Sequence, residues 1–236
     1  PPFPYDLFAH DLVIKHAHDQ RIKARNVVET LLVPTVITKA FVRGEGESLV
    51  RTYRLASDGK YLCVLVGGDT KSYRFDVARF RDIMMSIKRC AQELGYKMLV
   101  TNSRRTRSEI NRILEDELRH KDICPVFIDV NEYNPPNVVY GMVGLAELVF
   151  VTEESVSMIS ESVQSGQKVF LIRPSHGKVA LKHQKFHALL QERGLVKILE
   201  GCVSGAAIRE HCRARSGDEY LKKSKIEIQD KLKKLL

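Results

Sequence analysis

Short apolar runs alternate with amphipathic stretches along most of the chain. The runs are mostly continuous and not interrupted by polar residues, which is typical of strands buried on both faces of a parallel sheet. They predict strands at residues 11–15, 26–30, 61–66, 97–101, 126–130, 148–152, 168–172 and 196–199.

The stretches between these strands carry apolar residues at three-and-four spacing, as helices that cover a sheet do. The clearest spans residues 76–94, and Gly95 closes it. Further helices are predicted at residues 108–119, 138–147, 155–165 and 182–193. This alternation predicts an α/β fold with a Rossmann-like, doubly wound parallel sheet. Ligands of such sheets bind at the carboxyl ends of the strands, so the loops that follow the strands matter most.

The rhythm of strand and helix breaks at residues 41–60, which hold three glycines and many charges. We interpret residues 1–60 as the remnant of an N-terminal Rossmann-like domain with a linker, and residues 61–200 as a complete Rossmann-like unit. The chain begins at Pro1 without a Met, so we expect the N-terminal domain to be incomplete.

Residues 201–236 are predicted to form a helical tail. Its last part, residues 213–236, has 8 basic and 4 acidic residues. The apolar residues that share one helical face there are Leu221, Ile228, Leu232 and Leu235. Either this helix packs back across the sheet, or the basic tail makes a peripheral contact with a membrane surface or a partner.

Composition narrows the possible classes of protein. Hydrophobic residues make up 44% of the chain and charged residues 28%, which argues against a disordered chain or a collagen-like fibre. No uncharged apolar run reaches the ~18 residues of a membrane span. The five cysteines include no CxxC pair, which favours a reducing compartment and a cytoplasmic protein.

Net charge points to an anionic partner. The chain has 38 Lys and Arg against 29 Asp and Glu, a net charge of +9. Such a charge suits a phosphate, a nucleic acid or a lipid surface. Aromatic residues are not interleaved with the basic tail, and no nucleic-acid-binding signature is present, so we expect no nucleic-acid partner.

Two glycines directly follow the predicted strand at residues 61–66, in the sequence Gly67-Gly68-Asp69-Thr70. Glycine lets the backbone approach a ligand closely, and the N–H groups can face a phosphate. A plain turn between two elements has the same sequence. These four residues are therefore candidate binding residues, and the alternative is that they only form a turn between two elements.

Three arginines crowd the start of a helix in the loop after residues 97–101. The positive end of a helix disfavours cations unless an anion is bound there, and a guanidinium suits phosphate or carboxylate. The candidate binding residues are Ser103, Arg104 and Arg105. A solvated basic loop is the structural alternative.

The loop after residues 148–152 offers hydroxyl groups at a helix start. Thr152 ends the strand, Ser155 is a good N-cap and Ser157 lies in the first turn. Their hydroxyls and the free N–H groups could hold a phosphate. Glu161 lies about two turns further on, where a carboxylate can accept hydrogen bonds from a ribose diol. A capped helix with an exposed Glu fits the spacing equally well.

The loop after residues 11–15 reads His16-Ala17-His18-Asp19. A His-x-His pair can hold a metal, but no third ligand is near, and we expect no metal site. A loop His beside an Asp can act as a general acid or base, which makes His18 and Asp19 catalytic candidates. A polar loop at a strand end is the default alternative.

Taken together, these loops resemble those of the plant mitochondrial fission proteins named for elongated mitochondria, and of their bacterial relatives classed as glycosyltransferases. The matching segments are residues 64–69, 99–106 and 149–161, with further matches at 18–19, 26–28, 186–187 and Gly194. The resemblance covers about residues 11–199. One segment departs, because residues 134–141 carry an insertion where the family has Asn-Pro-Tyr followed closely by Gly.

The resemblance implies a GT-B-like arrangement, in which two Rossmann-like domains hold a nucleotide-sugar donor in the cleft between them. By the family's pattern, Glu161 holds the donor ribose and Ser155 and Ser157 face the diphosphate. Gly67, Gly68 and Arg105 close around it. The resemblance also implies transfer to an unknown acceptor without a metal or other cofactor, because helix N-termini and basic side chains offset the charge of the departing diphosphate.

We expect the acceptor base to come from the N-terminal unit, where His18 and Asp19 are the visible candidates. The rival hypothesis is a non-catalytic adaptor that keeps the fold and recruits a partner to a membrane surface. The resemblance to the plant fission proteins implies that role, and the basic tail suits it.

Overall fold

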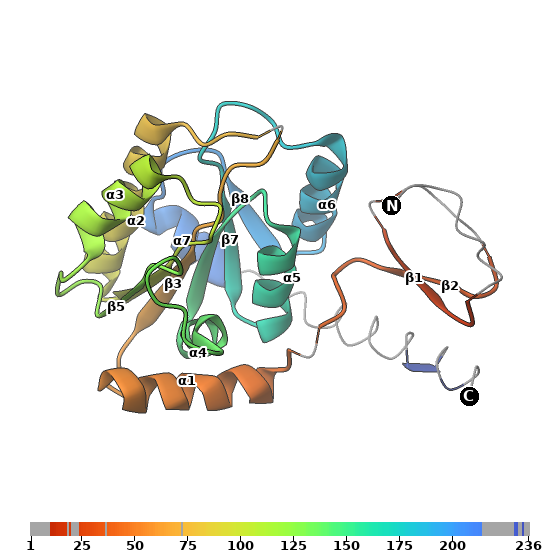
Figure 1. Ribbon diagram of the computed structural model, residues 1–236, viewed down its shortest axis with the longest axis horizontal. Helices are drawn as coiled ribbons and strands as arrows, with labels where there is room; N and C mark the ends of the chain where they lie inside the picture. The colour runs from red at the N-terminus through yellow and green to blue at the C-terminus, as the bar shows by residue number, and fades with distance from the viewer. Residues whose placement is uncertain are drawn as a thin grey trace.

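The computed structural model describes residues 10–17, 19, 24–35, 37–71, 73–213, 229–230 and 233. A parallel six-stranded sheet, in the order β5-β4-β3-β6-β7-β8, forms its centre (Figure 1). Its strands are β3 (Tyr61–Leu65), β4 (Lys97–Thr101), β5 (Val126–Ile128), β6 (Leu148–Thr152), β7 (Lys168–Ile172) and β8 (Val196–Leu199). The predicted α/β fold is confirmed, and every predicted strand forms within two residues of its expected bounds.

Helices cover both faces of this sheet, as Figure 1 shows. On one face lie α2 (Val77–Leu94), α3 (Ser108–Leu118) and α7 (Gly205–Arg213), which share one apolar core with the sheet. On the other face lie α4 (Val138–Leu145), α5 (Val156–Ser165) and α6 (Leu181–Glu192), which share the second core. The sheet is therefore doubly wound, and all five predicted helices are present.

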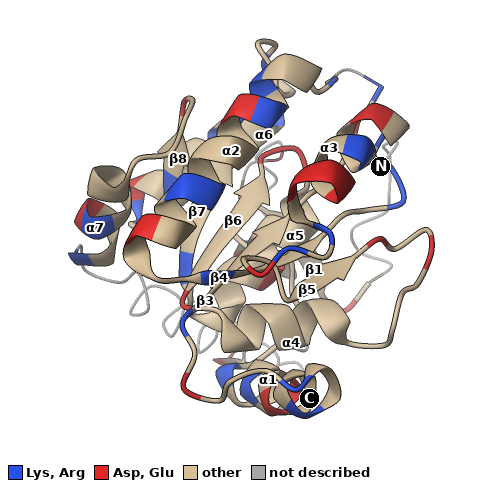
Figure 2. Cartoon of the chain, turned by 90° about the vertical axis from the view of Figure 1, so that its left-hand side faces the viewer, with Lys and Arg blue, Asp and Glu red and all other residues tan. Residues whose placement is uncertain are grey.

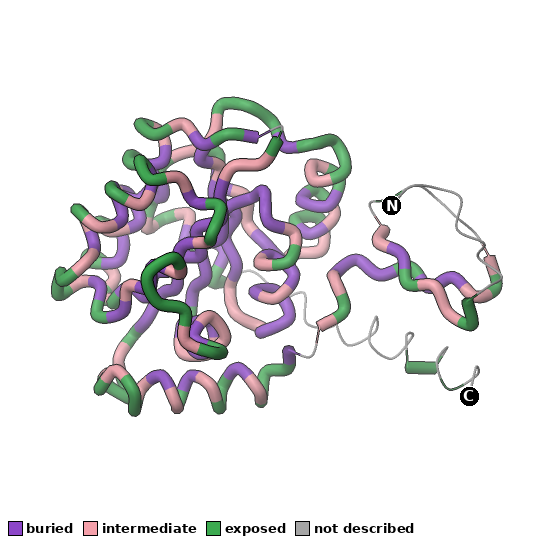
Figure 3. Tube along the Cα trace, viewed as in Figure 1, coloured by how far each residue is buried: buried purple, intermediate pink, exposed green. Residues whose placement is uncertain are grey.

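Continuous burial of the central strands explains their continuous apolar sequence. Every residue of β3 and β6 is buried, and Figure 3 shows the buried strands at the centre of the molecule. Successive side chains point to opposite faces, so Val64 enters the core under α2 and Cys63 enters the core under α5. On the α2 face Phe150 and Phe170 stack with ring centroids 4.9 Å apart.

The direction of winding reverses between β3 and β6. From β3 the chain passes through α2 to β4, whereas from β6 it passes through α5 to β7 on the opposite side. The two strands pair in parallel with Leu65 opposite Val151. Their carboxyl ends therefore lie side by side at the switch point, where open α/β sheets bind ligands.

A second, two-stranded parallel sheet precedes this unit and stands apart from the six-stranded sheet in Figure 1. It consists of β1 (Val13–His16) and β2 (Val27–Thr30). The chain that follows β2 is tied to α5, because the N–H of Val33 donates to Ser160 Oγ (3.2 Å) and Gln164 Nε2 donates to the carbonyl of Val33 (2.8 Å).

Most of the predicted linker at residues 41–60 is a helix, α1 (Lys39–Tyr53), which corrects that part of the interpretation. Thr38 Oγ1 caps it by accepting from the N–H of Phe41 (3.1 Å). The sequence predicted a linker here because glycines lower helix propensity. Gly46 of α1 and Gly144 of α4 instead let the two helix backbones pack closely, since a Cβ on Gly144 would overlap the carbonyl of Val42.

Helix α7 lies within the predicted tail, and its buried Ile208 packs into the core under α2. The predicted apolar face at Leu221, Ile228, Leu232 and Leu235 lies outside the described residues. Among the described residues, no helix combines the length and the apolar sequence needed to cross a bilayer. Basic and acidic residues are intermixed along the outer helices, as Figure 2 shows.

The contact between α1 and α4 predicts opposite effects for two glycines of the same region. Gly144→Ala should lower the free energy of unfolding by about 1–3 kcal/mol, because its methyl group must displace a backbone carbonyl. Gly44→Ala is the matched control on α1, where a Cβ meets nothing within 4 Å, and should raise it by roughly 0.5–1 kcal/mol. Urea unfolding of both variants measures this, and equal effects would contradict the close packing.

Candidate functional site

The tips of β3, β4 and β6 meet at the switch point. The N–H of Gly67 donates to Thr152 Oγ1 (2.8 Å), and the N–H of Gly68 donates to Glu154 Oε1 (2.9 Å). From the loop after β4, the hydroxyl of Thr106 donates to the carbonyl of Gly67 (2.5 Å). The three loops that the sequence singled out therefore lie together at one edge of the sheet.

The two glycines allow close approach between parts of the protein. A Cβ on Gly67 would overlap the carboxylate of Glu154, and a Cβ on Gly68 would overlap the carbonyl of Arg105. Both residues are buried, and both N–H groups already donate within the protein. This corrects the expectation that these N–H groups face a phosphate. At Gly68 the obstacle is backbone, so only glycine fits there, whereas at Gly67 the obstacle is the end of the Glu154 side chain.

The next two candidate residues also hold the loop together. Asp69 Oδ1 accepts from the N–H of Phe75 (2.9 Å), and Asp69 Oδ2 forms an ion pair with Arg107 Nε (2.8 Å). The N–H of Thr70 donates to the carbonyl of Tyr73 (2.8 Å). Arg107 is thus neutralised inside the protein, which leaves two of the three clustered arginines for a ligand.

Those two arginines are exposed. In the part of the chain that the structure describes, neither the Arg104 nor the Arg105 guanidinium makes a hydrogen bond or an ion pair. The carbonyl of Arg105 lies where a Cβ on Gly68 would be, so the loop that carries Arg105 packs against the end of β3. Ser103 Oγ accepts from the N–H of Arg105 (3.2 Å) and so orders the loop.

Helix α5 begins at the same edge of the sheet, and no side chain caps its N-terminus. Ser155 stands at the N-cap but its hydroxyl makes no capping hydrogen bond, and it lies 3.4 Å from Ser157 Oγ. The first N–H groups of a helix have no partner within the helix and carry partial positive charge. Two hydroxyls and these donors form an arrangement suited to an anion.

Glu161 is a half-buried carboxylate further along α5. Burial raises the pKa of its carboxyl group, and its charge helps to raise the pKa of Tyr140 on α4, after the larger effect of burial. Glu161 makes no hydrogen bond or ion pair with any described residue. A carboxylate that is partly removed from water without a partner is available to accept hydrogen bonds from a ligand.

Comparison with protein families identifies the family to which the chain belongs. The family described as mitochondrial fission ELM1 matches residues 1–216. The chain belongs to this family. The resemblance inferred from the loops is thereby confirmed.

Individual relatives of this ELM1-family chain are distant. It is 23% identical over 147 residues to an uncharacterized protein of Rickettsia prowazekii, which covers 61% of this chain and 40% of that protein. Among solved structures, it is similar to a family 9 glycosyl transferase from Veillonella parvula, with 11% identity, 80% of this chain and 52% of that chain covered, and a TM-score of 0.42.

A UDP-forming α,α-trehalose-phosphate synthase from Burkholderia xenovorans, solved with glucose-6-phosphate, is also similar. It has 13% identity and a TM-score of 0.44, and the match covers 89% of this chain and 48% of that chain. The ELM1-family chain thus spans about half or less of the length of these three proteins.

Glu154 is a site residue that the sequence interpretation missed. It is 4% exposed, its Oε1 accepts from Gly68 and from the hydroxyl of Thr152 (3.2 Å), and its Oε2 has no hydrogen-bond partner among the described residues. Burial raises the pKa of this carboxyl to about 7, against the opposing effects of its hydrogen bonds and of Arg105. The sequence signal that could have identified Glu154 is the pair of adjacent glutamates at the end of a predicted strand.

Of the two predicted catalytic residues, only Asp19 lies within the part of the chain that the structure describes. His18 lies outside the described residues. Asp19 is exposed, and its N–H donates to the carbonyl of His16 (3.0 Å). The short sheet to which β1 belongs stands apart from the switch point in Figure 1, and no described contact joins Asp19 to it.

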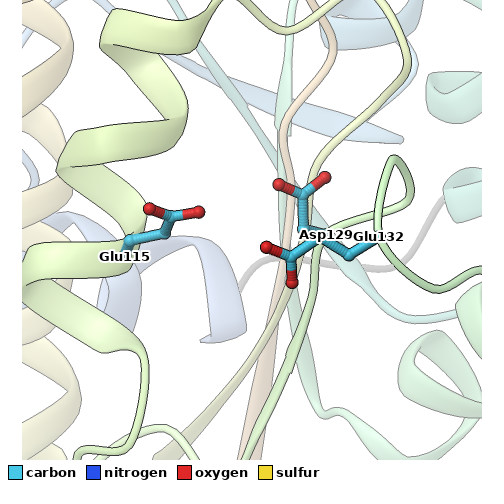
Figure 4. Close-up of side chains that lie close together, drawn as sticks. All are labelled: Glu115, Asp129 and Glu132. Atoms are coloured by element: carbon cyan, nitrogen blue, oxygen red, sulfur yellow. The ribbon is translucent and has the colours of Figure 1, made fainter.

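Three acidic side chains lie close together elsewhere, at the far edge of the sheet (Figure 4). The carboxylate oxygens of Glu115, Asp129 and Glu132 lie within 4.8 Å of one another. Arg119 NH2 reaches both Glu115 Oε1 (3.4 Å) and Glu132 Oε2 (2.9 Å), and Asn102 Nδ2 donates to Asp129 Oδ1 (2.9 Å). Protein donors therefore account for this cluster, and we assign no metal to it.

Glu154 predicts a pH dependence of stability. Its pKa is raised in the folded state, so its contribution is fully present below about pH 4.5 and is lost as the pH rises to about 7, on the order of 3 kcal/mol. In Glu154→Gln the side chain stays neutral and can still accept from Gly68. The variant should therefore lose less stability than the parent between pH 4.5 and 8 in urea unfolding.

The control for this comparison is Glu192→Gln, which changes an exposed carboxylate on α6 in the same way. It should follow the parent protein at every pH. If Glu154→Gln follows the parent as well, Glu154 does not hold its proton more tightly in the folded state.

Proposed function

We propose that the chain is the donor-binding part of a metal-independent glycosyltransferase that uses a nucleotide-diphosphate sugar. The observation that carries the proposal is the uncapped start of α5 at the switch point, where the Ser155 and Ser157 hydroxyls meet. Membership of the ELM1 family is consistent with it. The nucleotide-sugar, the transfer reaction and the unknown acceptor are all part of the proposal.

The diphosphate would bind at the start of α5. The helix offers N–H donors and positive potential, the two serines offer hydroxyls, and the loop that carries Arg105 packs against Gly68 at the same strand ends. Arg104, on the same loop, is exposed and free to turn toward an anion. In glycosyl transfer the diphosphate leaves with increased negative charge, and donors held in place before the reaction stabilise it without a metal.

Glu161 would hold the ribose. It lies six residues after Ser155, which is about 9 Å along the axis of α5. That spacing lets one helix contact the diphosphate with its first turn and the ribose hydroxyls with the carboxylate. The unpaired state of Glu161 supports this role, because a carboxylate accepts two hydrogen bonds from a vicinal diol. His18 and Asp19 stay our candidates for the acceptor base.

Ser157→Asp tests the diphosphate site without harming the helix. An acidic residue in the first turn favours the helix, but its charge repels a diphosphate. Uridine, guanosine and adenosine diphosphates and their sugars should be titrated into the full chain by calorimetry. The variant should bind its best ligand at least about tenfold more weakly than the parent.

Ser204→Asp is the matched control, since Ser204 is an exposed serine at the start of α7, which covers the face of the sheet opposite to α5. It should bind as the parent does. Failure of every nucleotide to bind the full chain, or equal affinities of the parent and Ser157→Asp, would contradict the proposed function.

Glu161→Ala separates the ribose contact from the diphosphate contact. The variant should bind the nucleoside diphosphate about tenfold more weakly, because hydrogen bonds to a charged group are worth about 1.5–3 kcal/mol. Its affinity for inorganic pyrophosphate, which has no ribose, should not change. Calorimetry with both ligands decides this, and an equal loss for pyrophosphate would remove Glu161 from the ribose.

The second candidate function is a non-catalytic adaptor that recruits a partner to a membrane surface. The description of the matched family as mitochondrial fission proteins favours it. The basic tail at residues 213–236 supplies the charge for peripheral contact with anionic lipid. Sedimentation with anionic vesicles that depends on the tail, together with no donor binding, would favour the adaptor over the transferase.

A further inference from the structure

A cavity of about 320 Å³ opens at the carboxyl ends of β7 and β8, on the flank covered by α2. Its walls are Arg79 in the first turn of α2, the loop between β7 and α6, and Glu200 directly after β8. Glu153 lies at its inner end. None of the residues that line it belongs to the candidate site at the switch point. The volume lies within the range of small-ligand sites.

Charged residues follow three neighbouring strands at this cavity. Glu153 comes directly after β6, Arg173 after β7 and Glu200 after β8. Arg173 Nε donates to Glu153 Oε2 (2.8 Å), and Arg173 NH1 donates to Glu200 Oε1 (2.5 Å). Such a chain of ion pairs at the ligand-binding edge of the sheet holds a guanidinium in one orientation.

Beneath the cavity, Glu153 is held by groups from two further elements. It is 2% exposed, and its Oε1 accepts from the hydroxyl of Tyr73 (2.8 Å). His187 Nδ1 on α6 lies 3.6 Å from its Oε2. Glu153 and Glu154 therefore point to opposite flanks of the same strand end. The Glu154 side chain lies at the switch point, and the Glu153 side chain lies at the cavity.

Positively charged side chains outnumber negatively charged ones on the cavity walls. Arg79 Nε donates to the carbonyl of Arg173 (2.8 Å), and its NH2 donates to the carbonyl of Glu200, which fixes a second guanidinium. Lys178 is exposed on the loop and makes no hydrogen bond or ion pair with any described residue. Arg79, Arg173 and Lys178 against Glu153 and Glu200 leave a net charge of 3 − 2 = +1.

The neutral and acidic walls add hydrogen-bond acceptors. Gln184 Nε2 donates to the carbonyl of Val179 (2.7 Å), which leaves the side-chain oxygen as an acceptor. Glu200 adds an exposed carboxylate. At about 30 Å³ per water, the cavity holds roughly ten water-sized groups. Fixed guanidinium groups suit a phosphate, and the acceptors suit hydroxyl groups.

We propose that this cavity is a second ligand site, separate from the switch point, and that it takes a compact phosphate monoester that carries hydroxyl groups. Arg79 NH1 and Arg173 NH2, which make no hydrogen bond to a described residue, bind the phosphate. Lys178 closes over it from the loop, and Glu200 and Gln184 accept from the hydroxyls. The site does not depend on the proposed transferase activity.

Calorimetric titration of the full chain tests the ligand class. The probes are glycerol 3-phosphate and glucose 6-phosphate, with glycerol, glucose and inorganic phosphate as controls. Both esters should bind more tightly than inorganic phosphate, and the neutral polyols should not bind. No binding of either ester at millimolar concentration overturns the proposal, as does equal binding of the polyols or of inorganic phosphate.

Lys178→Glu tests the location, since an exposed loop residue can change without harm to the fold. It should weaken ester binding about tenfold by charge reversal. Lys185→Glu makes the same change on an exposed face of α6 outside the cavity and should have no comparable effect. Arg79→Lys keeps the charge but loses the planar fork, so it should also weaken binding. Unchanged affinity in Lys178→Glu overturns the assignment.

The two sites are told apart by exchanging ligands between the variants. Lys178→Glu should bind uridine diphosphate as the parent does, and Ser157→Asp should bind the esters as the parent does. Loss of both ligands in both variants would mean one continuous site and would overturn the second one. Ester binding without nucleotide binding would support the cavity and contradict only the proposed transferase.

Discussion

Strands β3 and β6 pair in parallel at the middle of the sheet, and the chain winds away from that pair in opposite directions. The pairing brings together loops that lie more than eighty residues apart in the sequence, and hydrogen bonds from Gly67 and Gly68 to Thr152 and Glu154 then tie their ends. Without this register, the Arg105 loop and the start of α5 would not lie at the same point of the sheet edge. The geometry of the candidate site is a consequence of sheet topology, as in other open α/β sheets.

Glu153 and Glu154, at the carboxyl end of β6, point to opposite sides of the strand end. Glu154 faces Gly68 and Arg105, whereas Glu153 faces Tyr73 and Arg173. Each is nearly fully buried, and an unpaired buried carboxylate would be costly. Glu153 is satisfied by a hydroxyl and a guanidinium, while Glu154 keeps one oxygen without a partner in the described part of the chain. The two adjacent glutamates therefore place a carboxylate with different hydrogen-bond partners on each side of one strand end.

Sequence alone predicted the strands well, because a strand buried on both faces needs a continuous apolar run such as the one at β6. It missed α1, because Gly46 reads as a helix breaker until the close contact with α4 is known. It identified the strand-end loops but assigned the N–H groups of Gly67 and Gly68 to a ligand, since their protein acceptors come from a distant strand. Glu154 was missed for the same reason: its burial and its partners depend on tertiary packing.

The account rests on an anion at the start of α5, between the strand tips. A crystal structure of the full chain with uridine diphosphate tests this most directly. The account predicts the diphosphate beside Ser155, Ser157 and Arg105, with the ribose hydroxyls at Glu161. A nucleotide bound elsewhere on the chain would contradict it. So would the absence of nucleotide from the start of α5 in crystals grown at a nucleotide concentration that saturates binding in solution.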